Sequence, residues 1–255
     1  MISSRVIKYI RSLEKKRNRI EQGVFLAEGN KLVTDLCLHF YAELVIAKPV
    51  WIATQGNIAA KELLVADEAD IRRASFLRNP QDVIAAFRLP MWQIKAALSS
   101  AGEGELILAL DGIQDPGNLG TIIRLASWFG IPHLLCSEDT TDVFNPKSIQ
   151  ATMGALVNVE VHYCRLEEQL EKLREQGVPL FGASLNGEPL FDAMLGKGGV
   201  LVVGNEGQGI RPAVRSLLDR QLYIPRYATE AAAESLNVAV ATGILCAEFR
   251  RKNIE

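Results

Sequence analysis

Short apolar runs alternate with amphipathic stretches over residues 105–255. In one amphipathic stretch, Leu166, Leu170 and Leu173 recur at helical spacing. Alternation of this kind is typical of a parallel β-sheet that is covered by helices on both faces. We therefore predict an α/β domain whose strands lie at 105–111, 132–137, 156–162, 178–184, 198–204 and 220–225.

The N-terminal part has a different pattern. Apolar residues recur at helical spacing over 6–13, and the short apolar runs 43–47 and 61–65 are typical of strands. A small, polar, glycine-containing stretch then has the composition of a linker. The expected organisation is a small basic α/β domain at 1–98, a linker at 99–104 and the larger domain at 105–255.

Charge is distributed unevenly along the chain. Residues 1–95 contain 15 basic and 10 acidic side chains, whereas residues 96–255 contain 13 and 20. Contacts with phosphates give RNA affinity that is independent of sequence, so we predict RNA binding by a basic cluster. The alternative is a solvated helix face. The cluster consists of Arg11, Lys15, Lys16, Arg17 and Arg19.

The sequence indicates neither a metal site nor a membrane segment. Its four cysteines are far apart, without a C-x-x-C motif, and the three histidines are not paired with them at metal-ligand spacing. No apolar run approaches the roughly 18 residues of a membrane span, and the N-terminus lacks the apolar core of a secretory signal. We expect a cytoplasmic protein without a metal.

The segment that follows the first strand of the larger domain contains the first candidate residues. Asp115 and Asn118 lie in a turn that can begin a helix, and Arg124 is the only formal charge between Asp115 and Glu138. Its neighbours are apolar, so its guanidinium must reach solvent or meet an anion. The alternative is an ordinary exposed arginine on an amphipathic helix.

A second segment is rich in glycine. Gly204, Gly207 and Gly209 follow a strand directly, which lets a ligand approach the main chain closely. Their G-x-x-G-x-G spacing differs from that of dinucleotide-binding loops, and the chain contains no phosphate-binding G-x-x-x-x-G-K-[ST] motif. Glu206 lies in this turn, where binding local amides at a helix start would equally account for it.

A third segment follows the last predicted strand. Ile224 and Pro225 end that strand, and a polar, alanine-rich connection leads to an apolar helix. Ser235 is placed to cap this helix, and Asn237 lies in its first turn. Capping alone would account for the serine.

Together the three segments resemble the SpoU branch of the SPOUT RNA methyltransferases, which includes the TrmH-like enzymes. The motifs occur in the family's order, and the resemblance covers residues 105–252. The basic N-terminal region is also similar to a small RNA-binding domain, related to a ribosomal-protein fold, that many of these enzymes carry. The matching positions are Asn118, Gly120 and Arg124 in the first motif, 204–210 in the second, and 224–225 with 235–238 in the third.

The resemblance implies a 2′-O-ribose methyltransferase that acts on ribosomal or transfer RNA as a homodimer, with a deep trefoil knot in its C-terminal part. It assigns the central role to Arg124, as a base or as a ligand of the ribose 2′-oxygen and a phosphate. We favour the second role, because a guanidinium scarcely loses a proton near neutrality. The other catalytic positions are Asn118, Glu206, Ser235 and Asn237, which orient Arg124, the ribose and the loop. The positions implied for S-adenosyl-L-methionine are Val203, Gly204, Asn205, Gly207, Ile224, Pro225, Ser235 and Leu236.

The chain departs from the family pattern in two places. Residues 226–234 form a longer connection than usual and lack the usual glycine, so no cofactor contact carries over to them. Gln150 stands where many relatives have a basic side chain.

Two other classes of protein remain. A noncatalytic RNA-binding or ribosome-assembly protein would need the basic domain but not the set Asn118, Arg124, Glu206 and Asn237. A dinucleotide oxidoreductase would need a different glycine spacing and a ribose-binding acidic residue after the first strand, and neither is seen in the sequence. The sequence therefore favours the RNA methyltransferase.

Overall fold

The computed structural model describes residues 2–228 and 234–251, which form two compact units. One unit contains the described residues up to Met91 together with Asp142–Val157, and the other contains Trp92–Thr141 and the described residues from Asn158 onward. The division after Met91 lies before the expected linker, and the segment Asp142–Val157 groups with the N-terminal unit, which the sequence did not indicate. No helix in the described part of the chain is long and apolar enough to cross a membrane.

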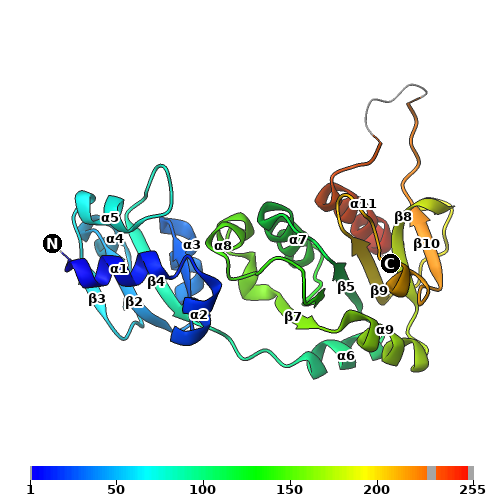
Figure 1. The fold of residues 1–255 in the computed structure, drawn as a ribbon, viewed down its shortest axis with the longest axis horizontal. Coiled ribbons are helices and arrows are strands. Elements are labelled where there is room, and N and C mark those ends of the chain that lie inside the picture. The colour runs from blue at the N-terminus through cyan, green and yellow to red at the C-terminus, as the bar shows by residue number, and fades with distance from the viewer. Residues whose placement is uncertain (1, 229–233, 252–255) are drawn as a thin grey trace. The chain divides into compact units, whose positions relative to one another are not determined.

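The N-terminal unit is built around a mixed sheet in the order β1-β4-β2-β3 (Figure 1). Strand β4 is antiparallel to both β1 and β2, and β2 is parallel to β3. Ile10 and Leu13 of the N-terminal segment are fully buried in the core with Leu26 and Ile84. The strands are β1 (Val24–Glu28), β2 (Ala42–Ala47), β3 (Leu63–Val65) and β4 (Val83–Arg88), and the helices are α1 (Ser4–Ser12), α2 (Lys16–Gln22), α3 (Asn30–Cys37), α4 (Pro49–Thr54) and α5 (Glu68–Ala74).

The expected linker at 99–104 is mostly helical, which corrects the prediction. Helix α6 spans Ile94–Gly102, and only the last two residues of the predicted linker lie beyond it. The helix forms because Ala97 and Ala101, one turn apart, are buried in the core of the C-terminal unit. Gly104 then adopts a φ of 90° where the chain turns into the next strand. The small residues that suggested flexibility therefore allow close helix packing.

The C-terminal unit contains a sheet of six strands in the order β10-β8-β9-β5-β6-β7, and every neighbouring pair is parallel. The predicted parallel α/β sheet is confirmed. The strand predicted at 156–162 instead spans Glu160–Cys164, because Ala155–Asn158 form a 3-10 helix before it. The strands are β5 (Leu106–Asp111), β6 (His133–Ser137), β7 (Glu160–Cys164), β8 (Leu180–Pro189), β9 (Gly199–Gly204) and β10 (Arg220–Tyr223).

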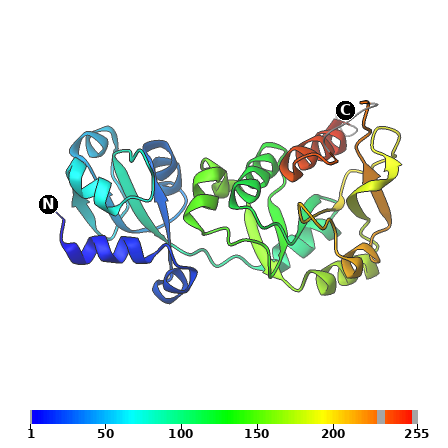
Figure 2. The same ribbon diagram turned by 45° about the horizontal axis from the view of Figure 1, so that its top comes forward.

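Helices cover both faces of this sheet (Figures 1 and 2). Leu180 faces a core shared with α6, α9 and α10, whereas its neighbour Phe181 contacts Phe249 of α11 with ring centroids 5.1 Å apart. Helices α7 and α11 lie side by side on that second face, where Leu125 packs against Gly243. The helices are α7 (Pro116–Trp128), α9 (Leu166–Glu175), α10 (Pro212–Arg215) and α11 (Val238–Arg251), with α8 (Pro146–Thr152) in the segment that groups with the N-terminal unit.

Candidate functional site

The loop after β5 leads directly into helix α7. Asp111 ends the strand, and Gly112 turns the chain with a φ of 76°, a conformation that favours glycine. The side chain of Asp115 caps α7 by accepting a hydrogen bond of 2.8 Å from the backbone N–H of Asn118. Pro116 occupies the first helical position, where its missing N–H costs nothing. Asn118 is thereby held in the first turn of the helix, at the carboxyl end of the strand.

The loop after β9 is a tight turn. The backbones of Asn205 and Gly209 are joined by two hydrogen bonds of 2.9 and 3.1 Å. A Cβ atom at Gly204 would lie 2.2 Å from the carbonyl carbon of Gly209, so only glycine fits there. The Asn205 Oδ1 atom accepts hydrogen bonds from the N–H groups of Gly207 and Gln208, and its Nδ2 donates to the Gly112 carbonyl. The side chain of Asn205 and the two backbone hydrogen bonds therefore fix the shape of this turn.

The third segment reaches the same edge through the start of α11. Asn237 caps this helix, because its Oδ1 accepts hydrogen bonds from the backbone N–H groups of Ala239 and Val240 at 2.9 and 3.3 Å. The predicted cap, Ser235, is exposed and lies outside the helix, so that prediction was wrong. The lengthened connection at 226–234 is described only in part, and residues 229–233 lie outside the described residues.

Asn118 joins all three segments. Its Nδ2 donates a hydrogen bond of 2.9 Å to Oε1 of Glu206, and its Oδ1 accepts one of 2.9 Å from Nδ2 of Asn237. Glu206 Oε2 also lies 3.5 Å from the backbone nitrogen of Gln114. The structure thus brings together three of the five residues that the sequence assigned to catalysis. Glu206 therefore contacts the loop after β5. The alternative interpretation was that it binds backbone amides of its own turn.

An ion pair between a partly exposed arginine and a buried carboxylate was not predicted from the sequence. Arg211 donates to Asp111 from its backbone N–H at 2.8 Å and from Nε at 2.6 Å, and the Asp111 side chain is fully buried. The hydrogen bond to Asp111 raises the pKa of the Arg211 guanidinium, so Arg211 stays charged at physiological pH. The sequence offered a weak signal, because an acidic residue ended one predicted strand and an arginine followed the glycine-rich turn.

Arg124 lies six residues after Asn118 on the same helix, α7. Over the six residues from Asn118 to Arg124 the helix rises by about 9 Å, and the two side chains leave it about 120° apart around the axis. Arg124 is exposed and forms no hydrogen bond or ion pair within residues 2–228 and 234–251. Glu206, which was expected to orient Arg124, contacts Asn118 instead. The guanidinium is therefore available to an anionic ligand.

The residues implied for the cofactor fall into two groups. Val203 and Gly204 are buried at the end of β9, and Ile224 and Pro225 are partly buried after β10. Leu236 is half exposed, and Ser235 and Gly207 are exposed. Most of these positions present backbone groups and small or apolar side chains. They suit the apolar and main-chain contacts of a nucleoside.

The basic cluster of the N-terminal unit divides into exposed and buried members. Arg11, Lys15, Lys16 and Arg17 are exposed, whereas Arg19 is only 2% exposed. Arg19 donates to the carbonyls of Leu13 and Glu14 and pairs with Asp142 of the same unit at 2.5 Å. It thus differs from the prediction, because a guanidinium committed to these partners cannot also bind RNA phosphates. The arginine stabilises the turn between α1 and α2.

Two family models match the chain, one in each part. The SpoU rRNA Methylase family matches residues 105–247, and the MRM3-like substrate binding domain matches residues 5–85. The first match covers more than half of the chain. This protein belongs to the SpoU methylase family, as the three motifs indicated.

Individual relatives agree with this assignment. The chain is 30% identical over 247 residues to the 23S rRNA (guanosine(2553)-2′-O)-methyltransferase RlmP of Bacillus subtilis, covering 96% of this chain and 95% of that protein. A solved structure of a TrmH-family protein from Porphyromonas gingivalis is 37% identical, with a TM-score of 0.86 and 99% coverage of both chains. An AdoMet-bound rRNA methyltransferase from Sinorhizobium meliloti is 29% identical, with a TM-score of 0.84 and coverage of 100% and 97%.

Proposed function

We propose that this protein transfers a methyl group from S-adenosyl-L-methionine to a ribose 2′-hydroxyl of 23S ribosomal RNA, at a guanosine. One observation carries the proposal: Asn118 hydrogen-bonds both Glu206 and Asn237, which unites the three family motifs at one edge of the sheet. The RNA and the base follow the names of the relatives, which include RlmB of Neisseria meningitidis, 32% identical over 163 residues.

The loops after β9 and β10 would hold the cofactor. The end of β9 offers the backbone of Val203 and Gly204, and Asn205 fixes the shape of the turn that follows. Ile224, Pro225 and Leu236 offer apolar contacts and main-chain groups. When bound, S-adenosyl-L-methionine supplies a methyl group on a positively charged sulfur. As the new O–CH₃ bond forms, the S–CH₃ bond breaks and S-adenosylhomocysteine is the leaving group.

Arg124 would bind the ribose 2′-oxygen or the adjacent phosphate. A guanidinium presents several donors in one plane, so it can hold two oxygens at once. Its role would be to place the 2′-oxygen and to stabilise the negative charge that grows as the hydroxyl proton leaves to water. Asn118, Glu206 and Asn237 would hold the three loops in the arrangement that binds the substrate. Ser235 would help to fix the third loop and the substrate.

The N-terminal unit would add RNA affinity through the exposed basic residues Arg11, Lys15, Lys16 and Arg17. Their positive charge favours phosphate contacts, and the match to a substrate binding domain over residues 5–85 supports this division of labour. The family resemblance further supports a deep trefoil knot in the C-terminal unit and a cytoplasmic location, where ribosomal RNA is found.

A homodimer through α7 and α11 would complete the enzyme. Trp128 of α7 is 84% exposed and Val240 of α11 is 54% exposed, although both side chains are apolar. The two helices pack together on one face of the sheet. Exposed apolar side chains on adjacent helices favour a protein partner, and an identical subunit is the partner that the resemblance implies.

The test is methyl transfer to a defined RNA. Purified protein and S-adenosyl-L-methionine labelled on its methyl group are incubated with ribosomal RNA from cells that lack the protein, and 2′-O-methyl positions are mapped afterwards. We expect label in 23S RNA at one guanosine ribose, and none in RNA from cells that contain the protein. Label confined to transfer RNA would contradict the proposed substrate. Cofactor binding without transfer to any RNA would favour the noncatalytic RNA-binding alternative.

A further inference from the structure

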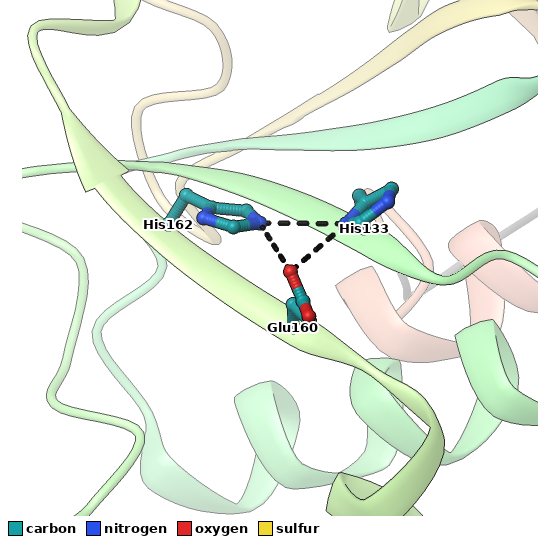
Figure 3. Close-up of side chains that lie close together, drawn as sticks. All are labelled: His133, Glu160 and His162. Atoms are coloured by element: carbon teal, nitrogen blue, oxygen red, sulfur yellow. Dashed lines mark hydrogen bonds and ion pairs between the residues drawn. The ribbon is translucent and has the colours of Figure 1, made fainter. Parts of the chain in front are cut away.

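Three side chains with metal-binding chemistry meet on the outer strands of the C-terminal sheet (Figure 3). His162 Nε2 lies 3.4 Å from His133 Nδ1, and Glu160 Oε2 lies 3.5 Å from each of these nitrogens. None of these residues belongs to the three motifs. Two imidazole nitrogens and one carboxylate oxygen pointing at a common centre form a donor set that zinc binds in proteins.

Strand pairing brings the three residues together. His133 is opposite Glu160 in the register of the parallel strands β6 and β7, so their side chains project from the same face of the sheet. His162 follows Glu160 by two residues and therefore points to that face as well. The cluster is part of the sheet rather than of a loop, and its backbone positions are fixed by the ladder.

The spacing of the donor atoms matches a tetrahedral metal site. In a tetrahedron with metal–ligand bonds of about 2.0–2.1 Å, neighbouring ligand atoms are about 3.3–3.4 Å apart. The triangle of 3.4, 3.5 and 3.5 Å is close to one face of such a tetrahedron. A hydrogen bond between the imidazoles would explain one edge of the triangle, but not why the carboxylate lies equally far from both nitrogens.

The surroundings also suit a metal. The side chain of His162 is 3% exposed, that of His133 is 13% exposed, and that of Glu160 is 38% exposed. The centre is thus enclosed on the imidazole side and open to solvent beside the carboxylate, which leaves room for water as a fourth ligand.

We propose that His133, Glu160 and His162 bind one zinc ion. Because His133 and Glu160 are the first residues of their strands, the ion would lie at the amino edge of the parallel sheet, opposite the edge formed by Asp111 and Gly204. It would link β7, an edge strand of the sheet, to β6 and would take no part in methyl transfer. The proposal is independent of the enzymatic function.

The sequence did not suggest this site, and the expectation of no metal followed from testing the histidines only against the cysteines. Along the chain, Glu160 and His162 are separated from His133 by more than 25 residues and form no spacing motif. Their proximity depends on the pairing of β6 with β7, which is a property of the folded sheet.

The test uses the full chain after removal of metals with a chelator. Zinc is titrated in by calorimetry, cobalt is added to a second sample for its visible spectrum, and thermal unfolding is followed with and without zinc. We expect one zinc per chain, the visible bands of a tetrahedral cobalt complex, and an increase in the melting temperature because zinc binds only the folded sheet.

Two variants and one control locate the site. Glu160→Gln and His133→Gln remove a ligand at positions that are at least partly accessible, and each should weaken zinc affinity at least tenfold and abolish the gain in melting temperature. His39→Gln changes the exposed histidine of the N-terminal unit and should leave all three measurements unchanged. The proposal is overturned if the metal-free chain takes up no zinc, or if either ligand variant binds zinc as tightly as the parent chain.

Discussion

The side-chain amide of Asn118 donates a 2.9 Å hydrogen bond to the carboxylate of Glu206, 88 residues further along the chain. The same amide accepts a hydrogen bond from Asn237 through its oxygen. Only a side chain that carries both a donor and an acceptor satisfies two partners on different loops in this way. This explains why an asparagine occupies the position, and it means that the three loops are coupled to one another through one residue.

The first prediction concerns a variant pair in which Asn118 and Glu206 exchange the roles of hydrogen-bond donor and acceptor. Asn118→Asp keeps the acceptor for Asn237 but places a carboxylate against that of Glu206, so we expect cofactor affinity to fall about tenfold, corresponding to roughly 1.4 kcal/mol. Adding Glu206→Gln restores a donor opposite the new carboxylate and should recover most of the loss. The measurement is calorimetric titration with S-adenosyl-L-methionine. A double variant as weak as Asn118→Asp would show that this hydrogen bond does not hold the cofactor loops.

The parallel sheet and the three loops followed from the sequence, because strands that are buried on both faces leave continuous apolar runs and the loops carry unusual residues. The contacts between loops did not follow. Ser235 and Asn237 are equally good helix caps by residue type, and the helix begins at Val238 with Asn237 as its cap. Asn237 also reaches Asn118, which is a tertiary contact that local propensity does not encode.

Burial was the second property that the sequence did not provide. Arg17 and Arg19 are two residues apart in one basic cluster and have the same charge, yet their side chains are 86% and 2% exposed. A count of charges treats them alike. Likewise, 99–104 has the composition of a linker, but Ala101 and, one turn earlier, Ala97 fit against the sheet. In both cases the tertiary environment decided the outcome.

The difference between these two arginines gives the second prediction. Arg19→Ala removes one partner of a buried ion pair and leaves Asp142, which is 15% exposed, without its cation. We expect a loss of about 3–5 kcal/mol in the free energy of unfolding of the N-terminal unit. Arg17→Ala is the matched control, because the pair of Arg17 with Glu21 is exposed, and it should change stability by less than about 1 kcal/mol. Urea denaturation measures both, and equal effects would contradict the role assigned to Arg19.

The third prediction concerns RNA binding by the exposed basic residues. Replacing Lys15, Lys16 and Arg17 together by alanine should weaken RNA affinity and flatten its dependence on salt. Each lost phosphate contact reduces the slope of log K against log salt by about 0.7–0.9, because fewer counterions are released. Filter binding to ribosomal RNA at several salt concentrations gives the slope. Replacing Arg72 and Arg73, which are also exposed on the N-terminal unit, is the control and should preserve it. A triple variant with the parental slope would show that the cluster is only a solvated surface.

The fourth prediction tests the proposed dimer. We expect the chain to sediment at twice its mass of 28.0 kDa at micromolar concentration. Trp128→Glu introduces a charge into the exposed apolar surface of α7 and should give the monomer, since burying an unpaired carboxylate is very unfavourable. Met194→Glu is the control, because Met194 is 85% exposed in the same unit but lies outside α7 and α11. A parent chain that sediments as a monomer would contradict the dimer.

The last prediction concerns Arg124. Arg124→Ala should abolish most methyl transfer while it preserves the fold and most of the cofactor affinity, because the side chain is exposed and has no hydrogen-bond or ion-pair partner in the described part of the chain. Arg124→Lys should also be slow, since an ammonium keeps the charge but loses the planar arrangement that binds two oxygens. Single-turnover methyl transfer to ribosomal RNA measures the chemical step, and a melting curve and a cofactor titration accompany each variant.

Arg174→Ala is the matched control for Arg124, because Arg174 is an exposed arginine on α9, a helix that packs on the other face of the sheet. Its transfer rate should equal that of the parent chain. If Arg124 were only a solvated helix residue, its substitution would be equally silent, with a change in stability within about 0.5 kcal/mol. A parental transfer rate for Arg124→Ala would therefore contradict a catalytic role. A slow Arg124→Ala with unchanged cofactor affinity, beside a normal Arg174→Ala, would place the guanidinium at the RNA ribose or its phosphate.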